Sequence, residues 1–279
     1  MSTLRQSGTL LGFVLIVAFF AVQLPDTFLT ARNLINISQQ LSMLAVVAAT
    51  MTIVMVMGDF DLSVGSMASL AGIVAAIMFA GGYPVWAGLG AALLIGIAGG
   101  LFNGVLVSVL GILPFVATLG TLTVYSGAAF LISDGKTIFG RDIPEGFSGF
   151  ARAGVEMGGI AIPYLTITAI LVIAACWFLL EHTTFGRRLY AIGGNKEAAH
   201  LAGIKVVRLR VLAFALTGLG AAGAGLMYAA RVASANPTQG SGLMLDAIAA
   251  VFLGMTMSRQ GEPRVIYTLV GVLILGILD

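Results

Sequence analysis

Two carboxylates separated by a single residue, Asp59 and Asp61, lie between apolar runs in the stretch VMVMGDFDLSVGS. A carboxylate at the centre of a bilayer raises the free energy of insertion by roughly 2.5 to 3.5 kcal/mol, so neither is expected to face lipid at mid-depth. Three roles fit such a pair. The carboxylates relay protons or sodium ions, contact a polar solute such as a sugar, or cap a break in a membrane-spanning helix.

The residues around the two carboxylates favour the capped helix break. Asp61 and Ser63 directly precede an apolar run, and both side chains can accept from the free N–H groups of a first helical turn. Gly58 and Gly65 permit an unusual backbone and a close approach. A relay needs further ionisable partners at depth, and the sequence offers only Asp246, near the start of a segment. We therefore predict a helix break, and a contribution to gating is the alternative.

Neutral polar side chains inside the apolar runs form a second group of candidates. Such side chains could line a path for a polar solute, because hydroxyls and an amide hold it more weakly than a charged group would and so allow its release. The other role open to them is interhelical hydrogen bonding, worth about 0.6 kcal/mol per pair in membranes. The candidates for a translocation path are Asn103, Thr118, Thr121, Thr123 and Tyr125.

The composition is that of an integral membrane protein. Apolar residues make up 59% of the chain and charged residues 9%, against roughly 45 to 50% and about 25% in soluble domains. We predict an all-α, polytopic bundle that forms a single transmembrane domain over residues 1–279. The nine predicted spans cover residues 8–24, 41–57, 64–81, 85–110, 112–132, 161–181, 210–230, 243–258 and 265–279.

Lysines and arginines are distributed unequally between the two sides of these spans, which predicts the orientation. The richer side carries Arg5, Arg187, Arg188, Lys196, Lys205, Arg208, Arg210, Arg259 and Arg264, and the other Arg32, Lys136, Arg141, Arg152 and Arg231. The N-terminus and a loop over residues 182–209 are therefore expected in the cytoplasm, and a loop over residues 134–160 outside it.

Small residues recur at four-residue intervals in three of the spans. Such ladders let helix backbones approach closely where lipid removes the hydrophobic drive for packing, so they predict a compact bundle. The ladders are Gly88, Ala92, Gly96, Gly100 and Gly104; Ala68, Gly72, Ala76 and Ala80; and Ala213, Thr217, Ala221, Gly225 and Ala229.

The cytoplasmic loop contains GGNKEAAHLAGIK, which has the signals of one short surface helix. The stretch begins with Gly193 and Gly194, offers Asn195 as N-cap, and ends on Gly203. Small alanines on the outer surface of this helix would let another protein approach closely. The alternative is a solvated, positively charged loop. The remaining residues of interest in this helix are Glu197, Ala198 and Ala199.

Signatures of enzymes, metal sites and nucleic-acid binding are weak throughout the sequence. The two histidines, His182 and His200, lack the spacing of a metal site. The GKT at residues 135–137 lacks the upstream glycine of a phosphate-binding loop, because Phe130 occupies that position. A net charge of +2 without a basic patch gives no indication of a nucleic-acid-binding surface. We therefore expect neither catalysis nor a metal nor a cofactor in this chain.

Three stretches in order carry a family resemblance: GDFDLSVGS, TLGTLTVYSGAAFLISDGKTI and TTFGRRLYAIGGNKEAAHLAGI. Together they resemble the monosaccharide permeases of bacterial ABC importers, of the ribose, xylose, galactose and arabinose type, which are related to the branched-chain amino-acid permeases. The run from Glu197 to Gly203 resembles the EAA loop by which such permeases dock on their ATPase.

The resemblance implies partners and a location. It implies an ABC permease fold with about ten spans, a second permease copy as homo- or heterodimer, and a bacterial inner-membrane location. A cytoplasmic ATPase would bind ATP and magnesium, and a periplasmic sugar-binding protein would deliver the cargo. Family members continue beyond the position of Asp279, so we expect this chain to be a fragment or a truncated gene product. The alternatives are an ion-coupled transporter or channel using Asp59 and Asp61, and an ABC permease for branched-chain amino acids or another small polar solute.

Overall fold

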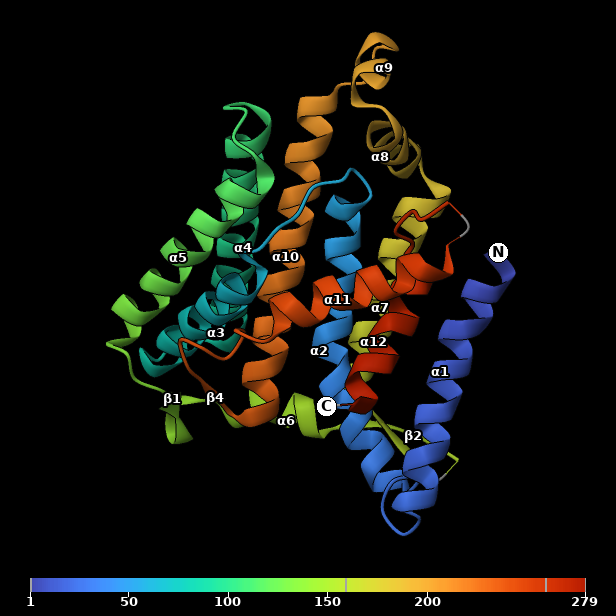
Figure 1. The fold of residues 1–279 in the computed structure, drawn as a ribbon. Coiled ribbons are helices and arrows are strands. Elements are labelled where there is room, and N and C mark those ends of the chain that lie inside the picture. Colours follow the sequence, from blue (N-terminus) through green and yellow to red (C-terminus); the bar gives the residue numbers. More distant parts are fainter. Residues whose placement is uncertain (1, 159, 259, 279) are drawn as a thin grey trace.

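Nine apolar helices form a bundle in the computed structural model (Figure 1). The structure describes residues 2–158, 160–258 and 260–278, without the side chains of residues 2–7, 9, 10, 157 and 160. Five described helices are long and apolar enough to cross a membrane, and four more are shorter apolar helices. Each coincides with one predicted span. The five are α2 (Ala31–Met55), α4 (Val85–Ser108), α5 (Pro114–Ser133), α7 (Tyr164–His182) and α10 (Val206–Val232), and the shorter four belong to α1 (Ser2–Gln23), α3 (Val64–Ala80), α11 (Leu243–Met257) and α12 (Val265–Leu278).

The start of α2 lies well before the predicted span of residues 41–57. Thr30 caps the helix by accepting from the Asn33 N–H at 3.3 Å, which fixes the start at Ala31. The first turns are polar, and the Gln39 side-chain amide donates to the backbone carbonyl of Ala151 at 3.2 Å. Hydropathy missed these turns because polar residues interrupt them.

The central helix α10 packs against α2, α3 and α4 through the small-residue ladders (Figure 1). A methyl group on Gly100 of α4 would overlap the backbone carbonyl of Phe214, and one on Gly225 would overlap that of Ala68 in α3. Glycine is therefore required at both close approaches. The close-packed bundle predicted from the ladders is confirmed.

The segment of residues 134–160, predicted as a loop between two spans, contains short helices and strands that cap one end of the bundle. It contains β1 (Ile138–Phe139), the 3-10 turn η1 (Gly140–Asp142), the amphipathic helix α6 (Glu145–Arg152) and β2 (Gly154–Met157). The strand β1 pairs antiparallel with β4 (Ser234–Ala235), and β2 with β3 (Ile160–Pro163). Phe147 and Ala151 give α6 a buried face, and this burial orders the segment.

Two helices, α8 (Thr184–Gly194) and α9 (Lys196–Leu201), form the opposite end of the bundle (Figure 1). The sequence predicts one helix here, and α8 was missed. Thr183 starts α8 by accepting from the Gly186 N–H at 3.3 Å, a threonine N-cap that signals a helix start. Arg259 and Asp279, which enter the predictions of orientation and length, lie outside the described residues, as does the side chain of Arg5.

Candidate functional site

The predicted helix break is a connector of residues 56–63, here called the α2–α3 connector. Helix α2 ends where Gly58 adopts the left-handed backbone conformation, with φ of 78°. The Gly58 and Asp59 N–H groups donate back to the Met55 and Val54 carbonyls at 3.0 and 3.2 Å. This arrangement satisfies the last carbonyls of α2, as glycine does at many helix ends. The chain is thus non-helical between Met55 and Val64, where the sequence predicts the break.

Asp59 forms a buried ion pair with Arg210 of α10. Arg210 Nε and Nη2 donate to the two carboxylate oxygens of Asp59, each at 2.7 Å, and the two residues are 7% and 5% exposed. A bidentate pair of this kind is strong and geometrically specific. The pair joins the α2–α3 connector to the first turns of α10.

The partner of Asp59 overturns one prediction. Arg210, counted with the lysines and arginines expected on the cytoplasmic side, lies inside α10, which begins at Val206 and buries it. The expectation that no ionisable group other than Asp246 lies near the carboxylates is therefore wrong. An arginine within the first turns of an apolar helix was the signal, since such a charge needs a partner.

Among the residues that the structure describes, Asp61 has only neutral hydrogen-bond partners. Its Oδ1 accepts from the Ser63 N–H at 2.9 Å and from the Ser63 hydroxyl at 2.6 Å. The amide of Asn103, on α4, donates to both carboxylate oxygens at 3.3 and 3.4 Å. The carboxylate thus shapes a tight local turn and connects it to α4.

The predicted helix cap does not form with these atoms. Ser63 stands at the N-cap of α3 with helical backbone angles, φ −81° and ψ −7°, and its side chain makes no capping hydrogen bond. Asp61 and Ser63 bond to each other instead of to the first turn, because Ser63 already has a helical backbone while a capping residue is normally extended. Gly65, the other break residue, lies within α3, and a methyl group there would meet the Gly240 carbonyl oxygen.

Four of the five path candidates gather where α3, α4 and α5 meet. Asn103, Thr118, Thr121 and Tyr125 are buried, and the Tyr125 hydroxyl donates to the Gly99 carbonyl at 2.9 Å. Asn103 donates to the Ser63 hydroxyl at 2.8 Å, while its Oδ1 has no hydrogen-bond partner among the described residues. Thr123 lies apart from them, on the exposed face of α5.

The helix α9 has the capping signals that the sequence predicts. Asn195 Oδ1 accepts from the Ala198 N–H at 2.9 Å, Glu197 lies in the first turn, and Gly203 follows the helix with φ of 81°. Ala198 is exposed but Ala199 is 5% exposed, so the expectation of two alanines on the outer surface is half wrong. Ala199 faces inward and anchors α9 to its own chain.

Gly193 and Gly194 belong to the last turn of α8 and do not open α9, which corrects their predicted place. Gly193 has a role of its own. A methyl group on Gly193 would overlap the carbonyl oxygen of Val56, the first residue of the α2–α3 connector. The helix pair α8–α9 therefore touches the connector directly.

A second set of contacts ties α8 to the segment between α11 and α12. The Tyr190 hydroxyl donates to the Pro263 carbonyl at 3.0 Å and lies 3.3 Å from Glu181 Oε1, while Arg264 donates to Glu181 at 3.1 Å. Burial, and secondarily the negative charge of Glu181, raise the pKa of Tyr190. Tyr190 is therefore a neutral hydrogen-bond donor.

Sequence comparisons place this arrangement among known permeases. The family model described as "Branched-chain amino acid transport system / permease component" matches residues 33–279. The ribose import permease protein RbsC of Bacillus subtilis is 39% identical over 281 aligned positions, covering 99% of this chain and 84% of the relative. The L-arabinose transport system permease protein AraH of Escherichia coli K12 is 37% identical, covering 98% and 81%.

A solved structure shares the fold. A metal-chelate type ABC transporter in an inward-facing conformation superposes with a TM-score of 0.56 at 14% sequence identity, covering 100% of this chain and 89% of that one. At this identity the likeness concerns the fold alone. The ABC permease fold and the family expected from the three sequence stretches are both confirmed. The chain is a membrane-embedded member of the family of branched-chain amino acid transport system permease components, and its relatives within that family include ribose and arabinose permeases.

Proposed function

We propose that this chain is the membrane-spanning subunit of an ATP-driven importer for a monosaccharide in the bacterial inner membrane. The observation that carries the proposal is the set of relatives. Permeases named for ribose, L-arabinose and D-allose are 34 to 39% identical to this chain over 98 to 99% of its length. Because several of these relatives are named for sugars, a sugar is a better candidate for the cargo than a branched-chain amino acid.

The energy comes from a separate cytoplasmic ATPase that binds ATP and magnesium and docks on α8 and α9. Leu201, in the last turn of α9, is 82% exposed, which is unusual for leucine outside the bilayer. Arg187 and Arg188 of α8 and Lys205, four positions after Leu201, are also exposed and favour an acidic partner. This end of the chain, with the N-terminus, is then cytoplasmic.

The α2–α3 connector transmits movement of α8 and α9 to the bundle. Gly193 of α8 packs closely against the backbone of Val56. Arg210 forms the ion pair with Asp59, and Asp61 accepts a hydrogen bond from Asn103 on α4. A displacement of the docked helices thus moves the connector and the helices that it joins. Asp59 and Asp61 then contribute to gating, because they hold the connector to α10 and α4.

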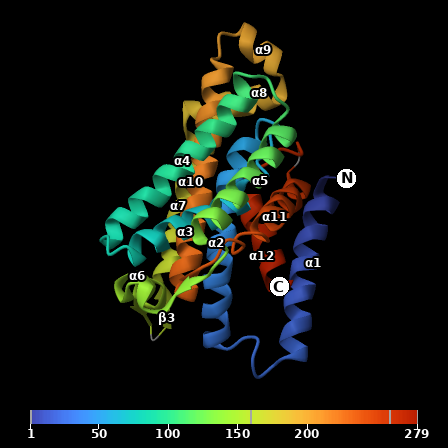
Figure 2. The same cartoon turned by 90° about the vertical axis from the view of Figure 1, so that its left-hand side faces the viewer.

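A second permease, either another copy of this chain or a related one, packs against α5. Figure 2 looks onto α5, which lies outermost on that side of the bundle. Gly120, Thr123 and Gly127 are exposed there, and a methyl group on either glycine would meet no atom within 4 Å. Small residues at this spacing let another helix approach. Thr123 then lines a path between the two permeases.

A periplasmic sugar-binding protein docks on the cap that contains α6, at the end of the bundle opposite α8 and α9.

Uptake measurements test the function. Cells without their own sugar importers would express this permease with its ATPase and binding protein. Uptake of labelled ribose, arabinose and allose, with leucine as control, should stop when the ATPase is inactivated and survive an uncoupler that collapses the proton gradient. Uptake that survives loss of the ATPase but stops with the uncoupler would show an ion-coupled transporter instead.

Docking on α9 has its own test. Glu197→Lys reverses the charge in the first turn of α9, and Gly203→Pro removes the left-handed residue that ends it, so both should abolish uptake and co-purification of the ATPase. Glu145→Lys is the matched control for co-purification of the ATPase, because it makes the same change in the first turn of α6 at the opposite end. Undiminished co-purification in both α9 variants would refute the docking site.

A further inference from the structure

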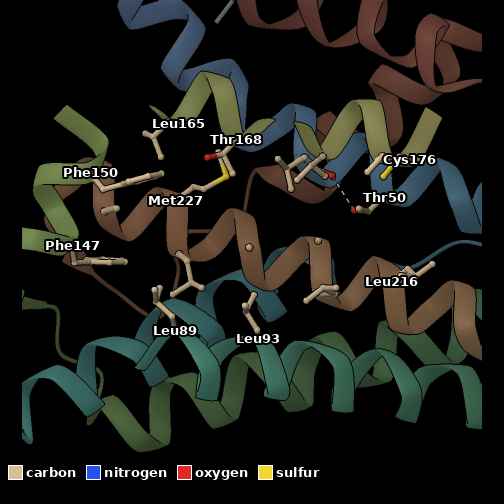
Figure 3. A pocket seen from close by; sticks show the side chains of 18 of the residues that line it. Thr50, Leu89, Leu93, Phe147, Phe150, Leu165, Thr168, Cys176, Leu216 and Met227 are labelled. Carbon is tan, nitrogen blue, oxygen red and sulfur yellow. Dashed lines mark hydrogen bonds between the residues drawn. The ribbon is translucent and has the colours of Figure 1, made fainter. Parts of the chain in front are cut away.

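A large apolar groove opens between α4 and α7, with a volume of about 750 Å³ (Figure 3). Helices α10 and α2 form its floor, and α6 closes one end. Figure 3 shows Leu89 and Leu93 of α4 on one side and Leu165 and Cys176 of α7 on the other. The groove is separate from the α2–α3 connector and from the residues proposed for the sugar path.

The floor of the groove follows a stripe of α10 that neighbouring helices leave partly uncovered. Leu216, Leu219 and Gly223 are half-buried, whereas most of α10 is fully buried. Their spacing of three and four residues places them on one face of the helix. A methyl group on Gly223 would meet no atom within 4 Å, so this glycine leaves open space where the other glycines of α10 contact backbone or side chains.

The polar groups that line the groove are already satisfied. The Thr50 hydroxyl donates to the Val46 carbonyl at 2.9 Å, and the Thr168 hydroxyl to the Tyr164 carbonyl at 2.8 Å. Cavities lined by apolar groups stay dry, because water there finds no hydrogen-bond partners. The groove is accordingly unsuited to water and to a sugar.

The surfaces beside the groove are those of helices that face lipid. Leu94 on α4 is 67% exposed, and Leu171 and Phe178 on α7 are 64% and 59% exposed. These side chains belong to helices long and apolar enough to cross the membrane, so the mouth of the groove opens sideways into hydrocarbon. At the closed end, Phe150 of the amphipathic helix α6 is 44% exposed, as expected where the hydrocarbon region meets the interface.

We propose that this groove is a lipid site that takes an acyl chain of a bilayer phospholipid. An empty groove would deprive its walls of dispersion contacts, and a hydrocarbon chain restores them without leaving any polar group unpaired. The chain enters between α4 and α7 and lies along the uncovered stripe of α10. Because Gly223 has no side chain, the groove is deep enough there for the acyl chain to lie against the α10 backbone.

Photo-crosslinking tests the site directly. The full-length permease would be placed in nanodiscs containing a phosphatidylcholine with a diazirine in mid-chain, and adducts would be located by peptide mass spectrometry. We expect adducts on Leu93 and Leu216 within the groove and on Leu94 outside it. Gly223→Leu fills the groove and should reduce the groove adducts at least tenfold, while the Leu94 adducts stay unchanged.

The controls separate a lipid site from general exposure to lipid. Gly90→Leu adds the same side chain at a helical glycine of α4 that also has open space and does not line the groove, so it should leave all adducts unchanged. If Gly223→Leu fails to insert into the membrane, Leu219→Trp would be used instead, because its larger side chain fills the groove from the same floor. The proposal would be overturned if the adducts on Leu93 and Leu216 persist in the filled variant. It would also be overturned if these adducts vanish when the assembled importer is used instead of the permease alone. Neither result depends on which solute is transported.

Discussion

Asp59 and Asp61 lie two positions apart in the α2–α3 connector and meet different surroundings. Asp59 faces a guanidinium that comes from α10, 151 positions away in the sequence. Asp61 accepts from its near neighbour Ser63 and from the neutral amide of Asn103. Two equally buried carboxylates therefore do different work, since one joins distant helices by charge and the other shapes a turn and connects it to α4.

The difference has an energetic consequence that mutation can measure. Removing one member of a buried ion pair leaves an uncompensated charge, which destabilises a protein by roughly 3 to 5 kcal/mol. Removing one neutral donor from a carboxylate that keeps others costs much less. Substitutions at the Asp59 pair and at the partners of Asp61 should therefore lower the free energy of unfolding by different amounts.

The largest effect is expected at the ion pair. Arg210→Ala should lower the free energy of unfolding by roughly 3 to 5 kcal/mol, because Asp59 stays buried without its partner. Replacing Asp59 and Arg210 together with leucine should cost less than Arg210→Ala, since apolar pairs substitute well for buried ion pairs. Thermal unfolding in detergent would measure both variants.

The double variant also separates stability from gating. If the pair only holds the connector in place, Asp59→Leu with Arg210→Leu should restore both unfolding temperature and uptake. Restored stability without uptake would show that the charges themselves take part in switching. A double variant no more stable than Arg210→Ala would contradict the account of the ion pair.

The next effect is expected at Asp61. Asp61→Ala removes the acceptor for the Ser63 N–H and hydroxyl and should cost about 2 kcal/mol of unfolding free energy. Asp61→Asn keeps one carbonyl oxygen in the same position and should cost about half as much. The pair of variants would be compared by thermal unfolding and uptake. Equal losses in both would show that the negative charge of Asp61, not its geometry, is needed.

The sequence predicted the helices far better than the pairing of these carboxylates. Apolar length alone located nine segments, because a bilayer imposes one spanning length on every helix. The break near Gly58 was also readable, since a glycine and two acids interrupt the run. The ion pair was not, because Arg210 lies 151 positions from Asp59, at the first residue of another predicted span, and hydropathy does not show which spans meet. The separation of Thr123 from Asn103 likewise depends on how α5 is rotated, which packing decides.

A smaller effect is expected at Gly58, which lets the backbone turn toward Asp59. Its φ of 78° is unfavourable for residues with a side chain, but a methyl group there would meet no atom within 4 Å. Gly58→Ala should therefore cost about 1 kcal/mol, from backbone conformation alone. Gly82→Ala, at φ 79° and equally open, is the matched control for stability, and it should leave uptake intact because it lies away from the connector.

The smallest effect is expected at Asn103, the partner of Asp61 outside the connector. Asn103→Leu keeps the volume of the side chain and removes the amide that reaches Asp61 and Ser63. Asp61 keeps both donors of Ser63, and side-chain hydrogen bonds in membranes average about 0.6 kcal/mol, so the loss of unfolding free energy should be of that size. The substitution also removes the unpartnered Oδ1 atom, which offsets part of the loss. A loss as large as that of Arg210→Ala would mean that Asp61 depends on α4 as strongly as Asp59 depends on α10. The contrast between the two carboxylates would then fail, since both would hold helices together and neither would serve mainly the local turn.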